Sequence, residues 1–502
     1  MEERPKAGTT PAPLGPDALR AAFRRVFPGV MFAMFLAAID QTILASALPA
    51  IVASLGGFAD LSWVVVAYLL AATVAAPLYG HIGDRFGRRA TLLAALIVFT
   101  IASLACALAP TLWALILARA LQGLGGGGLM TLSQALISEN VPPRQRAQFQ
   151  GYFAGVFAAS STLGPLLGAL LTEHLSWRAV FFINLPLGVL AAVLALRIPY
   201  YPPPADARFR ADVPGTLLFG VGMLSLLFAL SSAGNRFGWT DWRLYAVLAF
   251  AVGCLAALVF WEIRTPDPVI PVRLLASPVI WRSNIVVACF AAALFGAVLY
   301  LPLYLQLGRG FGIGASGLLL LPITLSLAAS SALTGRSIAR SGKLTAYPKR
   351  GLVVSTVAFG ALAATVTFAP TPVVLALTLL AGAGLGTTMP PTQIIVQSAG
   401  GTASLGSAVA SVSVSRSIGG ALGVAIVGAV VFVLVGGEDA LLASILPQIA
   451  ESGGTFLATL PDAQRQAIAG HLDSAFRIVF LVLAAFTLVG AYAASKVPAQ
   501  RL

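Results

Sequence analysis

The chain has 502 residues and a formal net charge of +13, with 58% hydrophobic and only 10% charged residues. A soluble domain carries roughly 25% charged residues, so this composition excludes a wholly water-exposed surface and requires one that faces lipid. The positive residues lie in short segments between apolar runs, a pattern that indicates membrane topology and argues against a nucleic-acid partner.

The first 28 residues are polar and rich in proline, and the apolar run that follows is long enough to cross a membrane. We interpret this run as a retained first helix, not as a cleavable signal. A crossing needs about 20 apolar residues, and this criterion predicts fourteen crossings. They lie near 29–49, 63–80, 91–109, 112–138, 148–171, 179–197, 213–233, 243–261, 283–306, 314–335, 351–368, 371–397, 406–434 and 474–495.

The positive residues also predict the orientation. An even number of crossings places both termini on one side, and that side carries 23 Lys and Arg residues against 6 on the other. Because cytoplasmic loops carry the excess of positive residues, we expect both termini in the cytoplasm.

Sparse glycines reveal an internal repeat. Gly80 and Gly87 recur 255 positions later as Gly335 and Gly342. Two further sets recur in the same order: Gly123, Gly125 and Gly127 as Gly382, Gly384 and Gly386, and Gly164 and Gly168 as Gly419 and Gly423. Glycines at such spacing let helices approach closely in lipid, so the repeat predicts two similar six-helix bundles around two extra helices.

This organisation divides the chain into seven parts. They are a cytoplasmic tail (1–28), an N-terminal six-helix bundle (29–197), a cytoplasmic linker (198–212), two additional helices (213–261), a second cytoplasmic linker (262–282), a C-terminal six-helix bundle (283–495) with an external segment (435–473), and a cytoplasmic tail (496–502).

Asp40 is the only acidic residue inside a predicted crossing. A charged carboxylate at mid-membrane costs roughly 2.5–3.5 kcal/mol on insertion scales, and binding a proton removes the charge. Arg119 and Arg416 are the only basic residues inside crossings, and either could alternate with a proton as the partner of Asp40. A static ion pair that joins two helices is the alternative.

Several motifs resemble those of one transporter family. The run Gly80-His-Ile-Gly83-Asp84-Arg85-Phe-Gly87-Arg88-Arg89 is similar to the signature loop of the major facilitator superfamily. Two more runs, which begin at Asp40 and at Trp177, resemble motifs of its fourteen-span drug:proton antiporter branch, the EmrB/QacA type. The run Arg119-Ala-Leu-Gln122-Gly123, followed by Gly125–Gly128, resembles the fourth-span motif linked to proton transfer, and Gly164-Pro165-Leu-Leu-Gly168 resembles the fifth-span antiporter motif. The likeness covers nearly the whole chain.

The resemblance implies an all-α integral membrane protein with the major facilitator fold. It also implies a monomeric, proton-coupled antiporter in a bacterial plasma membrane that exports hydrophobic or amphipathic compounds by alternating access. Neither an enzyme activity, a metal nor a cofactor is expected, because the proton gradient supplies the energy. The implied sites are proton coupling at Asp40 and Arg119, a conformational switch at Gly80, Gly83, Asp84, Arg85, Gly87 and Arg88, and an antiporter motif at Gly164, Pro165 and Gly168.

Physical reasoning gives the signature loop a role. Asp84 lies where it could cap the N terminus of a neighbouring helix and pair with Arg88, which would latch one conformation of the two halves. A plain positively charged loop is the alternative, but such a loop would not require three glycines.

Polar side chains inside crossings should face a partner or a cavity, because they are costly against lipid. The candidates for a substrate cavity are Tyr68, Gln122, Gln134, Gln306, Gln393, Gln397 and Arg416. The predicted crossings of the second half contain no acid, which disfavours dicationic substrates. Export of an endogenous lipid, antibiotic or siderophore remains the alternative function.

Overall fold

The computed structural model shows an all-helical chain in the residues that it describes. Parts of the predicted tails and linkers, and most of the predicted external segment 435–473, fall outside them. The described residues are 16–56, 62–141, 143–199, 212–232, 237–238, 240–265, 268, 272–311, 313–401, 404–436 and 462–498.

Seven helices of the first half coincide with the first six predicted crossings. They are α1 (Pro16–Leu55), α2 (Ser62–Phe86), α3 (Arg88–Ala107), α4 (Leu112–Asn140), α5 (Pro143–His174), α6 (Ala179–Phe182) and α7 (Asn184–Ala195). Only Gly87 separates α2 from α3, and its φ of 91° is a conformation that side chains with a Cβ rarely adopt. The signature loop is therefore a one-residue turn between two helices.

The long helices of the second half are arranged like those of the first half. It contains α10 (Val272–Leu275), α11 (Pro278–Leu307), α12 (Ile313–Leu318), α13 (Leu321–Ser341), α14 (Ala346–Thr365), α15 (Thr371–Gly386), α16 (Met389–Gly400), α17 (Leu405–Gly436) and α19 (Asp462–Ser495). The predicted crossings near 314–335 and 371–397 are each divided into two helices. Proline explains both divisions, because Pro322 lies in the first turn of α13 and Pro390 in that of α16, where no amide donor is needed.

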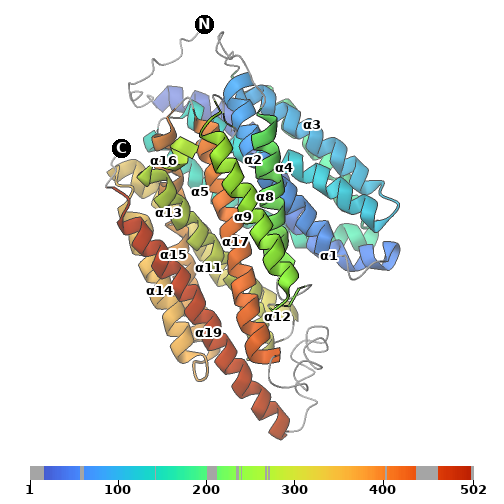
Figure 1. The fold of residues 1–502 in the computed structure, drawn as a ribbon, viewed down its shortest axis with the longest axis vertical. Coiled ribbons are helices and arrows are strands. Elements are labelled where there is room, and N and C mark those ends of the chain that lie inside the picture. Colours follow the sequence, from blue (N-terminus) through green and yellow to red (C-terminus); the bar gives the residue numbers. More distant parts are fainter. Residues whose placement is uncertain are drawn as a thin grey trace.

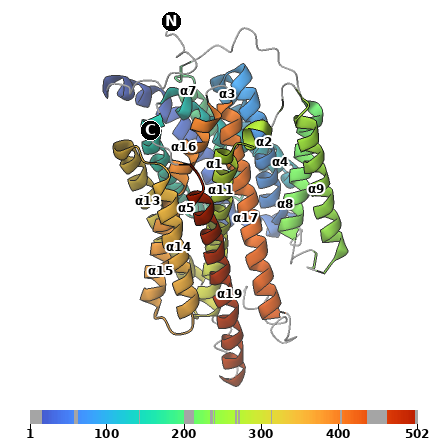
Figure 2. The ribbon, with the colours of Figure 1, turned by 60° about the vertical axis from the view of Figure 1, so that its left-hand side comes forward.

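The two extra helices, α8 (Val213–Ser232) and α9 (Trp242–Glu262), pair with each other at the edge of the bundle (Figure 2). Asp241 caps α9 by accepting a hydrogen bond from the backbone N of Arg243 at 2.9 Å. Of this pair, α8 packs against α2 of the first half and α17 of the second. It therefore covers the line along which those two helices meet.

Eleven helical stretches of the described chain are long and apolar enough to cross a membrane. The other three predicted crossings are also helical, since they coincide with α5, with α6 and α7 together, and with α14. The helices agree with the prediction, but the total of fourteen crossings stays a prediction.

The repeated glycines make equivalent contacts in the two halves. A Cβ on Gly123 or Gly127 of α4 would collide with the backbone of α2, and one on Gly382 or Gly386 of α15 would collide with the backbone of α13. In the same way, α5 packs closely on α1 at Gly164 and Gly168. Its counterpart α17 packs closely on α11 at Gly419 and Gly423. The duplication seen in the sequence is therefore also a duplication of helix contacts.

The two halves meet mainly where α5 packs against α13 and α2 against α17. The start of α1 and the end of α19 lie toward the same end of the molecule (Figure 1). We call it the terminal end, and the opposite end the distal end.

Candidate functional site

Asp40 and Arg119 form a buried ion pair within the first half. Nη1 of Arg119 on α4 lies 2.6 Å from Oδ2 of Asp40 on α1, and each side chain is 1% exposed. Removing one partner of such a pair leaves an uncompensated buried charge, which is strongly destabilising. Of the two arginines considered as partners, the structure brings Arg119 to Asp40, and no contact between Asp40 and Arg416 occurs in the described residues.

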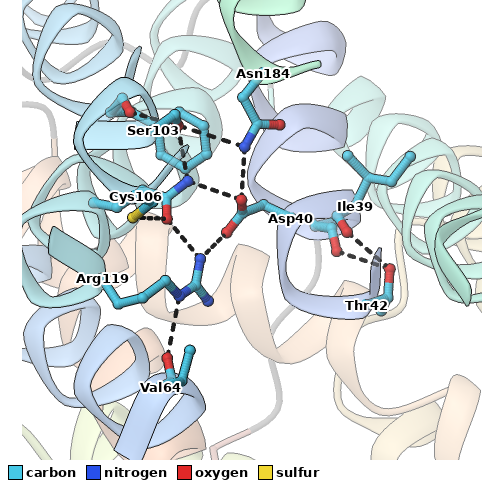
Figure 3. Close-up of polar contacts among 11 residues, drawn as sticks. Ile39, Asp40, Thr42, Val64, Ser103, Cys106, Arg119 and Asn184 are labelled. Atoms are coloured by element: carbon cyan, nitrogen blue, oxygen red, sulfur yellow. Dashed lines mark hydrogen bonds and ion pairs between the residues drawn. The ribbon is translucent and has the colours of Figure 1, made fainter. Parts of the chain in front are cut away.

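Three more polar side chains extend this pair into a hydrogen-bonded network (Figure 3). The other carboxylate oxygen, Oδ1 of Asp40, accepts from Nε2 of Gln122 at 2.8 Å and from Nδ2 of Asn184 at 2.7 Å. Both amides also donate to Oγ of Ser103 on α3, at 2.8 and 3.4 Å, and Oε1 of Gln122 accepts from Arg119 at 2.6 Å. The carboxylate of Asp40 therefore receives donors from α4 and α7 at once.

The guanidinium of Arg119 is fixed from its other side by α2. Its Nε donates to the carbonyl oxygen of Val64 at 3.1 Å, and its Cζ lies 4.4 Å from the ring centre of Tyr68. Tyr68 and Gln122, which the sequence placed among candidates for a substrate cavity, are 1% and 0% exposed and belong to this network. The amide of Gln122 bonds inside the first half, and Tyr68 contacts Arg119 through the face of its ring, whereas its hydroxyl has no hydrogen-bond partner in the described residues.

Two members of the network were not assigned a role from the sequence. Ser103 lies in an apolar run and Asn184 in a motif at the start of α7. Neither shows a partner in the sequence, because their contacts join α3 and α7 to α1 only after the bundle has packed. The one sequence signal for Asn184 is its place in the motif that begins with Trp177 and Arg178.

This arrangement can bind and release a proton with a structural consequence. An ionised carboxylate only accepts hydrogen bonds, whereas a protonated one also donates. Asp40 accepts three hydrogen bonds, from Arg119, Gln122 and Asn184, and a carboxylate has about four lone-pair sites, so a proton can bind at the remaining one. Because the proton removes the negative charge, it would weaken all three bonds, which are charge-assisted while the carboxylate is ionised.

The predicted antiporter motif packs on α1 close to Asp40. A Cβ on Gly164 of α5 would collide with the side chain of Thr42, and Oγ1 of Thr42 donates to the carbonyl oxygen of Ser160 at 2.8 Å. The motif lies wholly within α5: Gly164, Pro165 and Gly168. Movement of α1 at Asp40 would therefore be passed directly to α5.

Asp84, near the terminal end of α2, joins the two halves. Its carboxylate oxygens accept from the backbone N of Gly406 at 3.1 and 3.0 Å and from that of Ser407 at 3.4 Å. These residues begin α17, so a negative charge lies at a helix N terminus, where it is stabilising. A Cβ on Gly80 would lie 2.7 Å from the carbonyl oxygen of Gly406, so this contact also requires glycine.

Arg88 connects this contact to the rest of the first half. Its Nη2 lies 2.7 Å from Asp84 and its Nη1 lies 3.2 Å from Glu139 of α4. Burial, and to a smaller extent the positive charge of Arg88, lowers the pKa of the neighbouring Arg146 to about 10. Glu139 was not assigned from the sequence. The other predicted switch residues lie here too: Gly83 packs against α4, Gly87 forms the turn, and Arg85 is half-buried.

The remaining predicted cavity residues lie apart from Asp40. Nε2 of Gln306 on α11 donates to Oγ of Ser316 on α12 at 2.8 Å, and Gln134 is a buried residue of α4. Gln393 and Gln397 are buried in α16, and Arg416 is half-buried in α17.

Comparison with known proteins gives consistent matches. A model of the Major Facilitator Superfamily matches residues 30–424. The chain is 33% identical over 496 residues to the MFS-type transporter Rv1877 of Mycobacterium tuberculosis (strain ATCC 25618 / H37Rv), covering 96% of this chain and 72% of that protein. It is 31% identical over 404 residues to the multidrug transporter protein MdtP of Bacillus subtilis (strain 168), covering 80% and 74%. Its fold resembles the crystal structure of the human organic anion transporter MFSD10 (TETRAN), with a TM-score of 0.62 at 18% identity over 92% of this chain and 99% of that one.

Proposed function

The chain belongs to the major facilitator superfamily, and we propose that it is a proton-coupled antiporter that exports hydrophobic or amphipathic compounds. It is a transporter and not an enzyme. On this proposal it takes compounds from the cytoplasm or the inner leaflet of a bacterial plasma membrane, works as a monomer with both termini in the cytoplasm, and contributes to antibiotic resistance. The name of its relative MdtP as a multidrug transporter supports the substrate class.

One observation carries the proton coupling: the only acid that the sequence places inside a crossing is held by three hydrogen-bond donors. A structural ion pair between two helices would need only Arg119. Donors from Gln122 and Asn184 make the position of α7 sensitive to the charge on Asp40, which is what a coupling site requires.

Helix packing supports a route from this site to the second half. α5 packs on α1 beside Asp40 through Gly164 and Gly168, and on α13 of the second half along another face. Proton binding at Asp40 would shift α1, and α5 would transmit this shift to the contact between the halves. The bonds from Gly406 and Ser407 to Asp84 would then hold the state that is closed at the terminal end.

Transport by purified protein in liposomes with an imposed pH gradient tests the proposal. Wild-type protein should move fluorescent amphipathic compounds against their gradient when protons flow in the opposite direction. Asp40→Asn should abolish gradient-driven transport, because the amide keeps the size of the side chain but does not bind a proton at neutral pH.

Two measurements make the result interpretable. The variant should elute and unfold as a single species, and it should still exchange substrate down its gradient without a proton gradient. Undiminished proton-driven transport by Asp40→Asn would refute Asp40 as the coupling residue. Wild-type transport that ignores the pH gradient would refute antiport.

A further inference from the structure

Arg416 carries a positive charge that the described part of the chain does not neutralise. It makes no ion pair or hydrogen bond there, and its guanidinium carbon lies 5.9 Å from the ring centre of Phe157 on α5. Arg119, by contrast, has an ion pair and bonds to three groups. Charged side chains at membrane depth generally pair with one another or mark a substrate pathway, so this half-buried arginine, which has no ion pair in the described residues, is a candidate contact for a charged substrate.

The position of Arg416 is central in two respects. It lies ten residues after Gly406, which is about 15 Å along α17 and near the middle of a hydrocarbon core of about 30 Å. Oγ of Ser417, its neighbour, accepts a hydrogen bond at 3.0 Å from Thr73 of α2. Arg416 therefore belongs to the contact between the halves, with α2 and α5 of the first half beside it.

A second, independent feature lies on the adjoining helix. Gln393 and Gln397 of α16 are each 1% exposed, and the amide nitrogen and oxygen of both have no hydrogen-bond partner. Buried polar groups are nearly always paired, so four unpaired atoms on successive turns of one helix call for an explanation. α16 packs against α5 and α17, the helices that carry Phe157 and Arg416.

Both amides lie between the terminal end and the depth of Arg416, and Gln393 is the nearer of the two to that depth. Gln393 lies seven residues before the end of α16 at Gly400, or about 10 Å along the helix, and Gln397 lies three residues before it, or about 5 Å. A guanidinium binds carboxylates, sulfonates and phosphates through parallel N–H bonds. Amides on the next helix can donate to the remaining oxygens of such a group.

We propose that Arg416, with Gln393 and Gln397, binds the head group of the transported compound and that this compound is an amphipathic organic anion. The inference rests on the proposed export function and names its substrate class. Phe157 would face the apolar part of the compound. Asp40 cannot neutralise Arg416 in this state, since its carboxylate is engaged by donors inside the first half.

Export of an anion in exchange for a proton moves net charge across the membrane. An anion that leaves the cell and a proton that enters both move positive charge inward. Export of an anion should therefore be accelerated by an inside-negative membrane potential as well as by the pH gradient. A neutral compound exchanged for a proton would respond less to the potential.

Binding to the full-length protein in phosphatidylcholine nanodiscs tests the site. The probes are radiolabelled cholate, its neutral amide analogue cholamide, and the cation rhodamine 6G. Wild-type protein should bind cholate more tightly than the other two. Arg416→Gln should weaken cholate binding about ten- to a hundredfold, the usual range for a lost charge-assisted hydrogen bond, and change cholamide binding less than about twofold. Arg416→Lys, which retains the charge, should recover part of the loss.

Arg264→Gln is the matched control. Arg264 lies just beyond the end of α9, and its Nη1 donates to the carbonyl oxygen of Phe260, away from the contact between the halves. This variant should bind cholate as wild type does. A single elution peak and an unchanged thermal midpoint would show that Arg416→Gln is folded.

Competition with an anionic lipid in the discs shows which kind of anion the site recognises. If phosphatidylglycerol in the discs competes with cholate in wild-type protein, the head group recognised is that of an anionic lipid. If it does not compete, the site is specific for a soluble organic anion. Either result agrees with anion binding at Arg416.

Two outcomes would overturn the inference: equal cholate affinity in wild type and Arg416→Gln, or no preference of wild type for cholate over cholamide. In either case, normal export of rhodamine 6G by Arg416→Gln under a pH gradient would still support antiport. Failure of wild type to export any probe under a pH gradient would refute antiport, whatever the binding data show.

Discussion

Replacing Asp84 by asparagine perturbs the contact between the halves with little change in volume. Asparagine still offers one oxygen to the backbone N of Gly406, but it lacks the negative charge that α17 and Arg88 stabilise. Hydrogen bonds to a charged group contribute about 1.5–3 kcal/mol, and a charge at a helix N terminus about 0.3–1 kcal/mol. Because asparagine retains part of the bonding, we expect a loss of about 2 kcal/mol for the state closed at the terminal end.

A loss of about 2 kcal/mol changes the ratio of closed to open molecules about thirtyfold. Spin labels at Ala90 and Lys343, which are exposed at the start of α3 and just beyond the end of α13, report this ratio by double electron–electron resonance. Cys254 is the partly exposed native cysteine and should be replaced by serine. The variant should show a second, longer distance between the labels, together with slower export.

Asp241→Asn provides the matched control. Asp241 also caps a helix N terminus, that of α9, but it does not join the two halves. This change should leave the distance distribution between the labels as it is in wild type. An unchanged distribution in Asp84→Asn as well would show that the carboxylate is dispensable for closure, and the latch would be refuted.

Two further changes test the packing of the first half. Gly164→Ala should separate α5 from α1 and abolish proton-driven transport, because its Cβ would collide with Thr42, whereas Gly155→Ala in the same helix meets open space and should leave transport unchanged. Normal transport by Gly164→Ala would contradict the role given to this contact. Asn184→Ala should lower the free energy of unfolding by about 1.5–3 kcal/mol, because a hydrogen bond to the carboxylate of Asp40 is lost, and the thermal midpoint in detergent should fall accordingly. Ser138→Ala, which removes a bond to the carbonyl oxygen of Gln134, should lower it less, and equal effects would show that Asp40 gains little from the amide.

The hydrophobic pattern was sufficient to predict the helices, because each crossing must satisfy its own backbone hydrogen bonds within lipid. Divisions within crossings were missed, although Pro322 and Pro390 mark them in the sequence. Proline in a transmembrane helix can bend it, interrupt it or begin a new helix, and only packing with neighbours decides among these.

Prediction of the polar sites was limited by contacts between distant segments. Asp40 and Arg119 were identified because charge inside an apolar run is conspicuous, and the structure brings them together. Ser103 and Asn184 were not assigned, since serine and asparagine are common in helices and carry no charge. Tyr68 and Gln122 were expected to line a cavity, because a sequence shows that a polar side chain needs a partner but does not show whether that partner is protein or substrate.

The repeat relates the two halves in packing but not in chemistry. At the offset of 259 that aligns the glycines of α4 and α15, Thr378 and Ala381 stand where Arg119 and Gln122 stand in the first half, and both are buried. The described second half therefore has no counterpart of the Asp40 network at those positions, while its unpaired charge, Arg416, has none in the first half.

On the proposed mechanism, the proton and the head group of the substrate bind in different halves. α5 contacts α1 beside Asp40 and also carries Phe157 beside Arg416, so it is the element that both sites would displace. Because a ligand shifts an equilibrium only through its different affinity for two states, exchange requires proton and anion to favour opposite positions of α5. The two need not compete for one carboxylate. Division of the two tasks between duplicated halves would then allow the substrate site to change in evolution while the proton site stays intact.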